Sequence, residues 1–310
     1  MACSADTAFE PACSIDRLPG AQPICRVQSA ADGRIFAAKW KLVDSAIAPD
    51  QMDDIFIACR AAGSASVTRR SDGASMHRRP TIGAVTWVDG RMPAEWRIEG
   101  ACEVWHVYLP ADALQRFAEE DLGVGTVPTI RPLFAAEDPW LKGYFQMLAS
   151  EFEPSANAWQ QADPLFTAQA EHLLIHHLLA SHSDASPKAS NALSPAHAVN
   201  AMRPVALKRV QDYIAANLSR EIELTDLAAV ACTSVGHFLR GFRAASGMTP
   251  HRYVQEQRLA HARELLLTTR LPVSLIATEC GFKTASHLSA KFRSRMGTSP
   301  SRFRACVEER

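Results

Sequence analysis

The chain up to Leu109 consists of short apolar segments that are separated by turn signals. Apolar or β-branched residues dominate each segment, and dipeptides such as Asp32-Gly33 and Asp72-Gly73 lie between them. Many short strands at this spacing, with no helical pattern between them, are typical of an all-β barrel or sandwich. The pattern predicts strands at Arg34–Trp40, Asp54–Arg60, Ala65–Arg70, Thr81–Trp87, Glu95–Ile98 and Cys102–Leu109.

Helical spacing begins after Pro110. We predict helices at Ala111–Asp121, Asp138–Phe152 and Asp163–Ser181. The last of these has apolar residues near helical spacing, which gives it a wide apolar stripe. Such a stripe has to be buried against the β-rich domain or against a second copy of itself. The helices within 138–181 are therefore a candidate homodimer contact.

The composition changes between His182 and Pro204, where Ser, Pro and Asn replace the periodic pattern. Such a composition is typical of an interdomain linker. A chain of 310 residues also favours two domains over one. We predict a disordered N-terminal segment at 1–20, a β-rich domain at 21–182, a linker at 183–203 and a helical domain at 204–306.

The helical domain contains an internal repeat at a spacing of 50 residues. Internal repeats reveal architecture before single motifs do. The repeated positions are aromatic, basic, Gly and Pro residues in one order, so each copy should form the same local structure. They are His237 and His287, Phe238 and Leu288, Phe242 and Phe292, Arg243 and Arg293, Gly247 and Gly297, and Pro250 and Pro300.

Each copy predicts a short helix, a tight turn and a second helix, at about 225–246 and 273–296. Ser234 can cap the second helix of the first copy, and Gly281 suits a left-handed turn in the second. This is the plan of a helix-turn-helix unit, in which the second helix enters the major groove of DNA. We expect Phe238 and Phe242 to face inward, together with Leu288 and Phe292.

A single long helix, Thr249–Leu267, should join the two units, with Pro250 at its first position. It would span about 27 Å at 1.5 Å per residue. A rod of that length can hold two recognition helices near one helical repeat of DNA apart, about 34 Å. One chain could then contact two successive major-groove segments.

The formal net charge of zero conceals a split between the two halves. From Arg203 onward there are 17 Lys and Arg and 9 Asp and Glu, which gives +8, and residues 1–202 therefore carry −8. A concentrated positive charge attracts the phosphate backbone of DNA. The charge of this half agrees with a nucleic-acid partner.

Several short motifs in the helical domain follow one another in a specific order and spacing. They are Leu227-Ala228, Phe238-Leu239-Arg240-Gly241-Phe242-Arg243, Gly247-Met248-Thr249-Pro250, Ile276-Ala277, Cys280-Gly281-Phe282 and Gly297-Thr298-Ser299-Pro300. With these motifs, residues 206–304 resemble the DNA-binding domain of the AraC/XylS family. The resemblance implies seven helices, asymmetric tandem sites on double-stranded DNA, and activation through contact with RNA polymerase.

The resemblance also assigns the DNA-contacting positions. The first recognition helix would present Val235, Gly236, Leu239, Arg240 and Arg243, with Arg240 donating to a guanine edge and Arg243 to a phosphate. The second would present Ala285, Ser286, Ser289, Ala290, Lys291 and Arg293. Members of this family often have Arg where Ala290 stands. We therefore expect the first unit to carry more of the sequence specificity.

The β-rich domain resembles, at the level of pattern, the cupin-like sensor domain of the same family. This implies an α+β protein with a cupin-like β-barrel that holds a small-molecule effector, dimerises, or does both. Candidate pocket residues are Trp87, Trp96, His106 and Tyr108, and each could instead be plain core. Alternation places His106 and Tyr108 on one strand face, but the sequence leaves open which face points inward.

We expect no enzyme, metal or cofactor. Potential ligands such as His77, Glu95 and His106 are dispersed, and no nucleophile motif is present. His172 and His176, four residues apart on one helix, are more simply explained as interface or surface residues. Two alternatives stay open: a cupin-type enzyme with a DNA-binding tail, and a regulator whose N-terminal domain only dimerises.

The eight cysteines form no CxxC pair, which favours a reduced, cytoplasmic protein. Cys232 and Cys280 lie at the two predicted turns and are interpreted as small buried residues, with a redox switch as the alternative. No apolar run predicts a leader or a membrane span. The sequence as a whole predicts a DNA-binding transcription regulator, an activator that responds to a small molecule.

Overall fold

The computed structural model describes residues 14–29, 33–48, 54–71, 73–122, 124–152, 159–185 and 202–308. The chain divides into two compact units. The first comprises Met1–Asp163 and Leu173–Leu193, and the second comprises Pro164–His172 and Ser194–Arg310. Most of the predicted linker, at 186–201, lies outside the described residues, as do residues 1–13.

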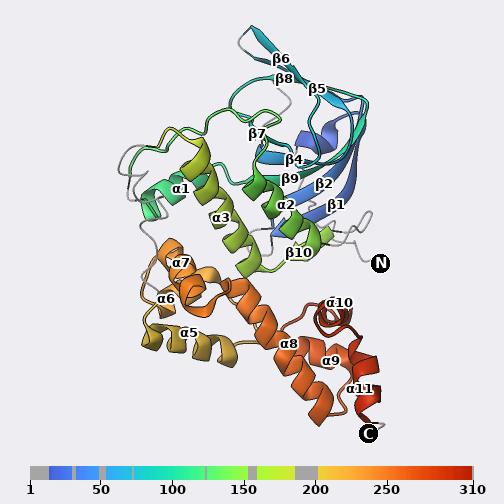
Figure 1. The fold of residues 1–310 in the computed structure, drawn as a ribbon, viewed down its shortest axis with the longest axis vertical. Coiled ribbons are helices and arrows are strands. Elements are labelled where there is room, and N and C mark those ends of the chain that lie inside the picture. Colours follow the sequence, from blue (N-terminus) through green and yellow to red (C-terminus); the bar gives the residue numbers. More distant parts are fainter. Residues whose placement is uncertain are drawn as a thin grey trace, which may run out of the picture. The chain divides into compact units, whose positions relative to one another are not determined.

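The strands of the first unit form two separate sheets (Figure 1). The six-stranded sheet has the order β10-β1-β2-β9-β4-β7, and the four-stranded sheet has the order β3-β8-β5-β6. All six predicted strands are present within a few residues of their predicted ends, and the structure adds four more. The ten strands in the described part of the chain are β1 (Ala21–Ser29), β2 (Ile35–Val43), β3 (Ala46–Ile47), β4 (Ile55–Gly63), β5 (Ser66–Ser71), β6 (Ala74–Arg78), β7 (Val85–Asp89), β8 (Glu95–Glu99), β9 (Ala101–Leu109) and β10 (Trp159–Ala162).

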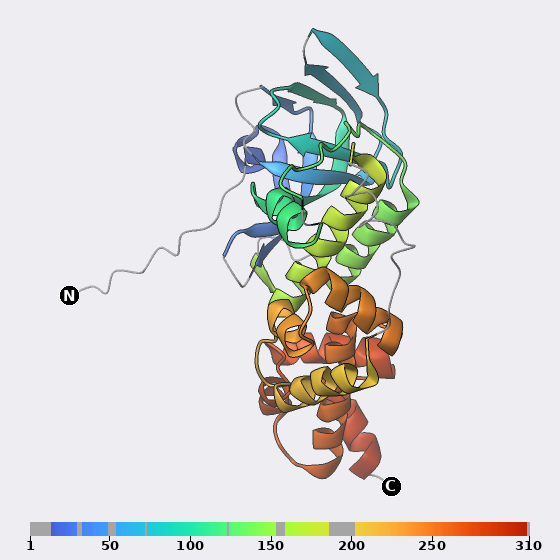
Figure 2. The same ribbon diagram turned by 90° about the vertical axis from the view of Figure 1, so that its left-hand side faces the viewer.

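The prediction of a closed barrel is wrong, because other segments occupy the edges of the larger sheet. On one edge, β10 pairs in parallel with β1. On the other edge, the backbone N–H of Val85 in β7 donates to the carbonyl of Ala136 at 2.8 Å, and that of Trp87 donates to Leu133 at 3.0 Å. Among the described residues, the edges of the larger sheet therefore pair with these segments and not with β3 or β6 of the smaller sheet. Figure 2 shows the β5–β6 hairpin projecting at the end of this unit.

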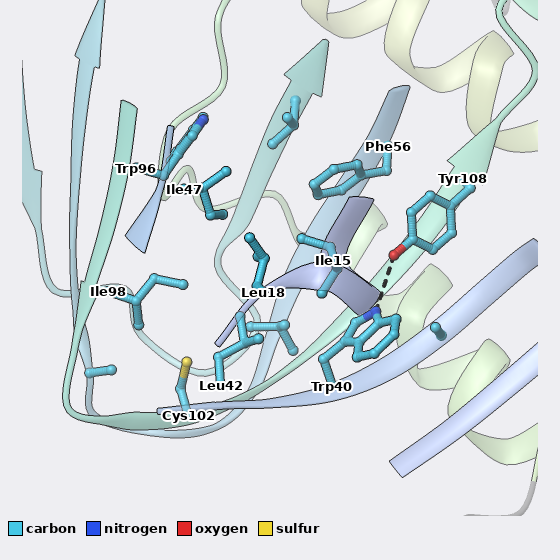
Figure 3. Close-up of a cluster of buried hydrophobic side chains, with 14 of the residues drawn as sticks. Ile15, Leu18, Trp40, Leu42, Ile47, Phe56, Trp96, Ile98, Cys102 and Tyr108 are labelled. Carbon is cyan, nitrogen blue, oxygen red and sulfur yellow. Dashed lines mark hydrogen bonds between the residues drawn. The ribbon is translucent and has the colours of Figure 1, made fainter. Parts of the chain in front are cut away.

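A cluster of buried apolar side chains lies between the two sheets (Figure 3). Trp40, Phe56 and Ile98 belong to this buried cluster, and the Trp40 Nε1 donates to the Tyr108 hydroxyl at 3.1 Å. Ile15, which is 1% exposed, joins it from the 3-10 helix Ser14–Arg17. The prediction that 1–20 is disordered is therefore wrong for the part that begins at Ser14.

Three helices accompany the sheets: α1 (Ala113–Glu120), α2 (Pro139–Glu151) and α3 (Pro164–His182). Each lies within two residues of its predicted bounds. Asp138 caps α2 by accepting from the backbone N–H of Leu141 at 2.9 Å, and Pro139 takes the first helical position. No helix among the described residues has the length and apolar composition needed to cross a membrane.

The second unit is helical and has two apolar clusters. The described residues contain ten α-helices in all, of which seven lie here: α5 (Pro204–Ala216), α6 (Leu224–Val230), α7 (Val235–Ser246), α8 (Pro250–Thr268), α9 (Val273–Glu279), α10 (Ala285–Met296) and α11 (Pro300–Glu308). One cluster contains Phe238 and Phe242, and the other contains Leu288 and Phe292. In Figure 1, α8 runs from the first group of helices to the second.

Candidate nucleic-acid interface and ligand cavity

The first helix-turn-helix consists of α6 and α7. Ser234 caps α7 by accepting from the backbone N–H of His237, as predicted. Phe238 and Phe242 are fully buried and pack against Leu227 from α6 in one cluster. One face of α7 is therefore held on the core, and the opposite face is left for contacts outside the unit.

The second helix-turn-helix, α9 and α10, has the same construction. Thr284 caps α10 by accepting from the backbone N–H of His287 at 3.0 Å. Leu288 and Phe292 are fully buried and pack with Ile276 from α9. Both recognition helices end at a glycine, Gly247 or Gly297, with φ of +75°.

The two copies differ by one residue in their turns. Their recognition helices are 50 residues apart, at Val235 and Ala285, whereas their first helices are 49 apart, at Leu224 and Val273. The left-handed position two residues after the first helix is Cys232, with φ of +54°, in one copy and Gly281 in the other. The spacing of 50 taken from the sequence therefore holds for the second helices but not for the first.

Gly281 lies where only a glycine fits. A Cβ built on it would lie 2.2 Å from the Leu218 carbonyl oxygen and 2.8 Å from Nε of Arg258. The Arg258 side chain is itself buried, and it donates through Nε to the Leu218 carbonyl at 3.0 Å and through Nη2 to the Arg220 carbonyl at 2.7 Å. The turn of the second helix-turn-helix is thus packed against the segment that follows α5.

Helix α8 joins the two helix-turn-helix units as one continuous element. It has 19 residues, so it is about 28 Å long. Thr249 caps it, and Pro250 takes the first helical position. On α8, Val254 belongs to the apolar cluster of Phe238 and Phe242, and Leu259 belongs to that of Leu288 and Phe292. The predicted linking helix Thr249–Leu267 is confirmed within one residue at each end.

The structure exposes only part of the predicted contact set on α7. Arg243 is exposed, and Arg240 and Val235 are half-buried. Leu239, at 6% exposure, belongs to the same cluster as Phe238, and Gly236 is also buried. The expectation that Leu239 and Gly236 face outward is wrong, because the buried side of α7 is wider than the Phe238–Phe242 stripe.

On α10 the predicted residues form a small, weakly polar face. Ser286, Ala290 and Arg293 are exposed, whereas Ala285, Ser289 and Lys291 are half-buried. None of these six is in the apolar cluster of this helix. The outward face of α10 therefore offers hydroxyl and methyl groups with basic residues toward its C-terminal end.

Several guanidinium groups on these helices carry uncompensated charge. Arg240, Arg243 and Arg293 form no ion pair within the described part of the chain. Arg295, by contrast, donates from Nε to Glu256 at 2.9 Å. An exposed cation without an internal partner is free to approach an external anion such as a phosphate.

His237 is a candidate contact that the sequence interpretation missed. It is exposed on α7, three residues before Arg240, so the two share a helix face. Its Nδ1 lies 3.0 Å from the Ser234 hydroxyl, which fixes the ring near the start of the helix. The presence of His at both repeated positions, 237 and 287, is the sequence signal that could have identified it.

The two turn cysteines differ in environment. Cys280 is buried, and burial raises the pKa of its thiol to about 12, which keeps it protonated and unreactive. Cys232 is exposed, so the interpretation of both as buried residues is wrong for Cys232. A thiol switch that uses both residues is not supported, because one of them is inaccessible.

The first unit contains a cavity of about 80 Å³ between the two sheets. Of the predicted lining residues, Trp96 and His106 line it. Trp87 and Tyr108 do not: Trp87 borders a separate pocket, and the Tyr108 hydroxyl is held by Trp40 and lies 3.2 Å from Nδ1 of His106. The face of β9 that carries Val104 and His106 is thus the inner one.

The sequence interpretation also missed Arg60, which lines the same cavity and is 4% exposed. It lies inside β4, between apolar neighbours such as Cys59 and Ala61. The predicted strand Asp54–Arg60 ends at this residue, whereas β4 continues to Gly63. A lone basic residue between apolar neighbours is the sequence signal that could have identified it, because an unpaired buried charge is costly.

A third group that was missed comprises Asp138, His177 and His182. Among the described residues, it is the only set of three potential ligand atoms close enough together to hold a metal ion. The Asp138 Oδ2 is 2.8 Å from His177 Nε2 and 2.6 Å from His182 Nε2. These are hydrogen-bond lengths, whereas ligand atoms around zinc lie roughly 3.3 Å apart. The arrangement ties the start of α2 to the end of α3.

About a third of this chain is similar to parts of known regulators. The "Probable transcriptional regulator LumQ" of Photobacterium leiognathi is 35% identical to this chain over 94 residues. The match covers 30% of this chain and 38% of that protein. The "HTH-type transcriptional activator RhaR" of Escherichia coli strain K12 is 35% identical over 91 residues, covering 29% and 32%. The chain therefore spans about a third of the length of these relatives.

Two solved structures are also similar to about a third of this chain. The DNA-binding domain of AdpA in complex with a target DNA is 32% identical and covers 34% of this chain and 94% of that one, with a TM-score of 0.33. An AraC-type transcriptional regulator from Chromobacterium violaceum is 29% identical and covers 33% and 90%, with a TM-score of 0.32. Residues 227–305 match the family model described as "Helix-turn-helix domain".

Proposed function

We propose that the protein is a sequence-specific DNA-binding transcription regulator. The observation that carries the proposal is the pair of helix-turn-helix units, whose recognition helices α7 and α10 are each held on their core by two fully buried apolar residues. The unpaired cations Arg240, Arg243 and Arg293 on these helices suit contacts with guanine edges and phosphates. The names of LumQ and RhaR as transcriptional regulators support it.

Within this proposal the two recognition helices have unequal tasks. Arg240 on α7 is the residue we assign to a base edge, and Arg243 is assigned to the phosphate backbone. On α10, the exposed residues Ser286 and Ala290 offer weaker discrimination, so this helix would mainly clamp the backbone through Lys291 and Arg293. The assignment of the first helix-turn-helix as the main source of specificity rests on these side chains.

The first unit is proposed as the sensor, a cupin-like domain that binds a small-molecule effector in the cavity between its sheets. The largely apolar lining and the presence of a few polar groups are typical of ligand sites. Homodimer formation through the helices within 138–181 and contact with RNA polymerase are further proposals for the assembled regulator. Trp140 on α2, 40% exposed, is the residue of these helices best placed for such a dimer contact.

A selection experiment tests the proposed function. The full chain is used to select sequences from a pool of random double-stranded DNA, and its affinity for the selected sequence and for a shuffled one is measured at 50 and 200 mM salt. We expect a clear preference for the selected sequence. Both affinities should fall by about 10³-fold or more if about six phosphates are contacted. Enrichment of no sequence would contradict the proposal.

A further inference from the structure

The cavity of the first unit contains a buried cation with spare hydrogen-bonding capacity. Arg60 lies on β4 with a relative exposure of 4%. Its Nη2 donates to the Ala65 carbonyl at 3.2 Å, but its Nη1 has no hydrogen-bond partner. No carboxylate in the described part of the chain forms an ion pair with it.

The surroundings of Arg60 make this arrangement unusual. Apolar side chains such as Leu42, Phe56 and Val88 form most of the wall. His106 adds no second charge, because burial lowers its pKa to about 3, and burial also raises the pKa of the Cys102 thiol. Among the described residues that line the cavity, Arg60 is therefore the only ionised group. A buried charge without a counter-ion is energetically unfavourable. A ligand that supplies the missing negative charge would therefore stabilise Arg60.

We propose that this cavity binds a small apolar carboxylic acid, whose carboxylate accepts a hydrogen bond from Nη1 of Arg60 and whose hydrocarbon part lies between the sheets. The acid would be the effector of the sensor, so in this respect the inference rests on the proposed function. A guanidinium recognises a carboxylate by charge as well as by geometry, and charge-assisted bonds of this kind are the strong ones.

The composition of the wall excludes other ligand classes. A cation would be repelled by Arg60. A sugar needs many hydrogen-bond partners, whereas the polar side-chain atoms in the wall besides those of Arg60 belong to Thr86, Trp96, Cys102 and His106. One water needs about 10–15 Å³ of such space, so 80 Å³ would hold about five to eight waters and suits a small acid. A monoaromatic or short aliphatic acid fits this size.

The test compares acids with their uncharged amides on the full chain, without DNA. Benzoate and hexanoate are titrated against benzamide and hexanamide, with the melting temperature and the heat of binding as readouts. We expect saturable binding of at least one acid, with an affinity at least tenfold higher than that of its amide. Equal binding of acid and amide, or saturable binding of neither acid, would overturn the proposal.

Variants separate the role of Arg60 from general effects on the fold. Arg60→Gln should abolish the difference between acid and amide. Arg97→Gln, which changes an exposed arginine on β8, should leave it unchanged. Ala58→Leu keeps Arg60 but fills the cavity, so it should weaken acid binding at least tenfold even if Arg60→Gln does not fold. Unchanged acid binding in Ala58→Leu would place the acid elsewhere and contradict the proposal.

DNA binding is measured on the same preparations by the selection described above. If the chain selects DNA but binds no acid, only the effector class is wrong. If it binds an acid through Arg60 but selects no DNA, the cavity assignment stands and the proposed regulatory function fails.

Discussion

Gly281→Ala is expected to lower the free energy of unfolding of the helical unit by about 2–4 kcal/mol, the largest stability change among the turn positions. A φ of +74° already disfavours any residue with a Cβ, and here the Cβ would lie 2.2 Å from the Leu218 carbonyl oxygen. That oxygen is a backbone atom held by Arg258, so it cannot move without breaking the contact. Calorimetric unfolding of the full chain should show the helical transition about 10 °C or more lower.

Gly297→Ala is the matched control for this change. Gly297 has nearly the same φ, +75°, but a Cβ there would meet no atom within 4 Å. Only the backbone strain applies, and it costs about 1–2 kcal/mol. Equal losses in the two variants would show that the contact between Gly281 and Leu218 contributes nothing.

Arg240→Ala is expected to reduce affinity for the selected DNA by about 1–3 kcal/mol, or about 5- to 150-fold, with the loss confined to one base position. Arginine can donate two hydrogen bonds to a guanine edge, and Arg240 forms no ion pair in the described residues that would have to be broken first. The measurement is a titration of wild type and variant against the selected sequence and its single-base variants. The variant should lose its preference at the position that Arg240 contacts.

Arg243→Ala provides the comparison. We expect it to weaken binding to all sequences about equally and to reduce the salt slope by about one, because Arg243 is assigned to a phosphate. If Arg240→Ala also weakened binding uniformly, with no change in base preference, its assignment to a base edge would be wrong.

The helical unit was largely predictable from the sequence because its signals are local. Caps at Ser234 and Thr249, and glycines at helix ends, fix the helix bounds within a few residues, since each acts within one turn. The burial of Leu239 was not predictable from such local signals. Whether a residue beside the buried stripe faces solvent depends on packing from distant segments, and the cluster around Leu239 includes Leu165, which is 74 positions away.

The β-rich unit was predicted in part. Alternation located β9 and β4, but closure into a barrel depends on which segments occupy the sheet edges, and β10 and the Leu133–Ala136 segment come from far along the chain. The same limit applies to the cavity. His106 was identified from its strand, whereas Arg60 and the group formed by Asp138, His177 and His182 depend on long-range contacts.

A hydroxyl-radical footprint of the full chain on its selected DNA tests the central claim, that two helix-turn-helix units on one rigid helix contact DNA together. We predict two protected segments on one face of the duplex, with centres about 10–10.5 base pairs apart, and weaker protection of the shuffled sequence at the same protein concentration. A single protected segment, or equal protection of the selected and the shuffled DNA, would contradict the account.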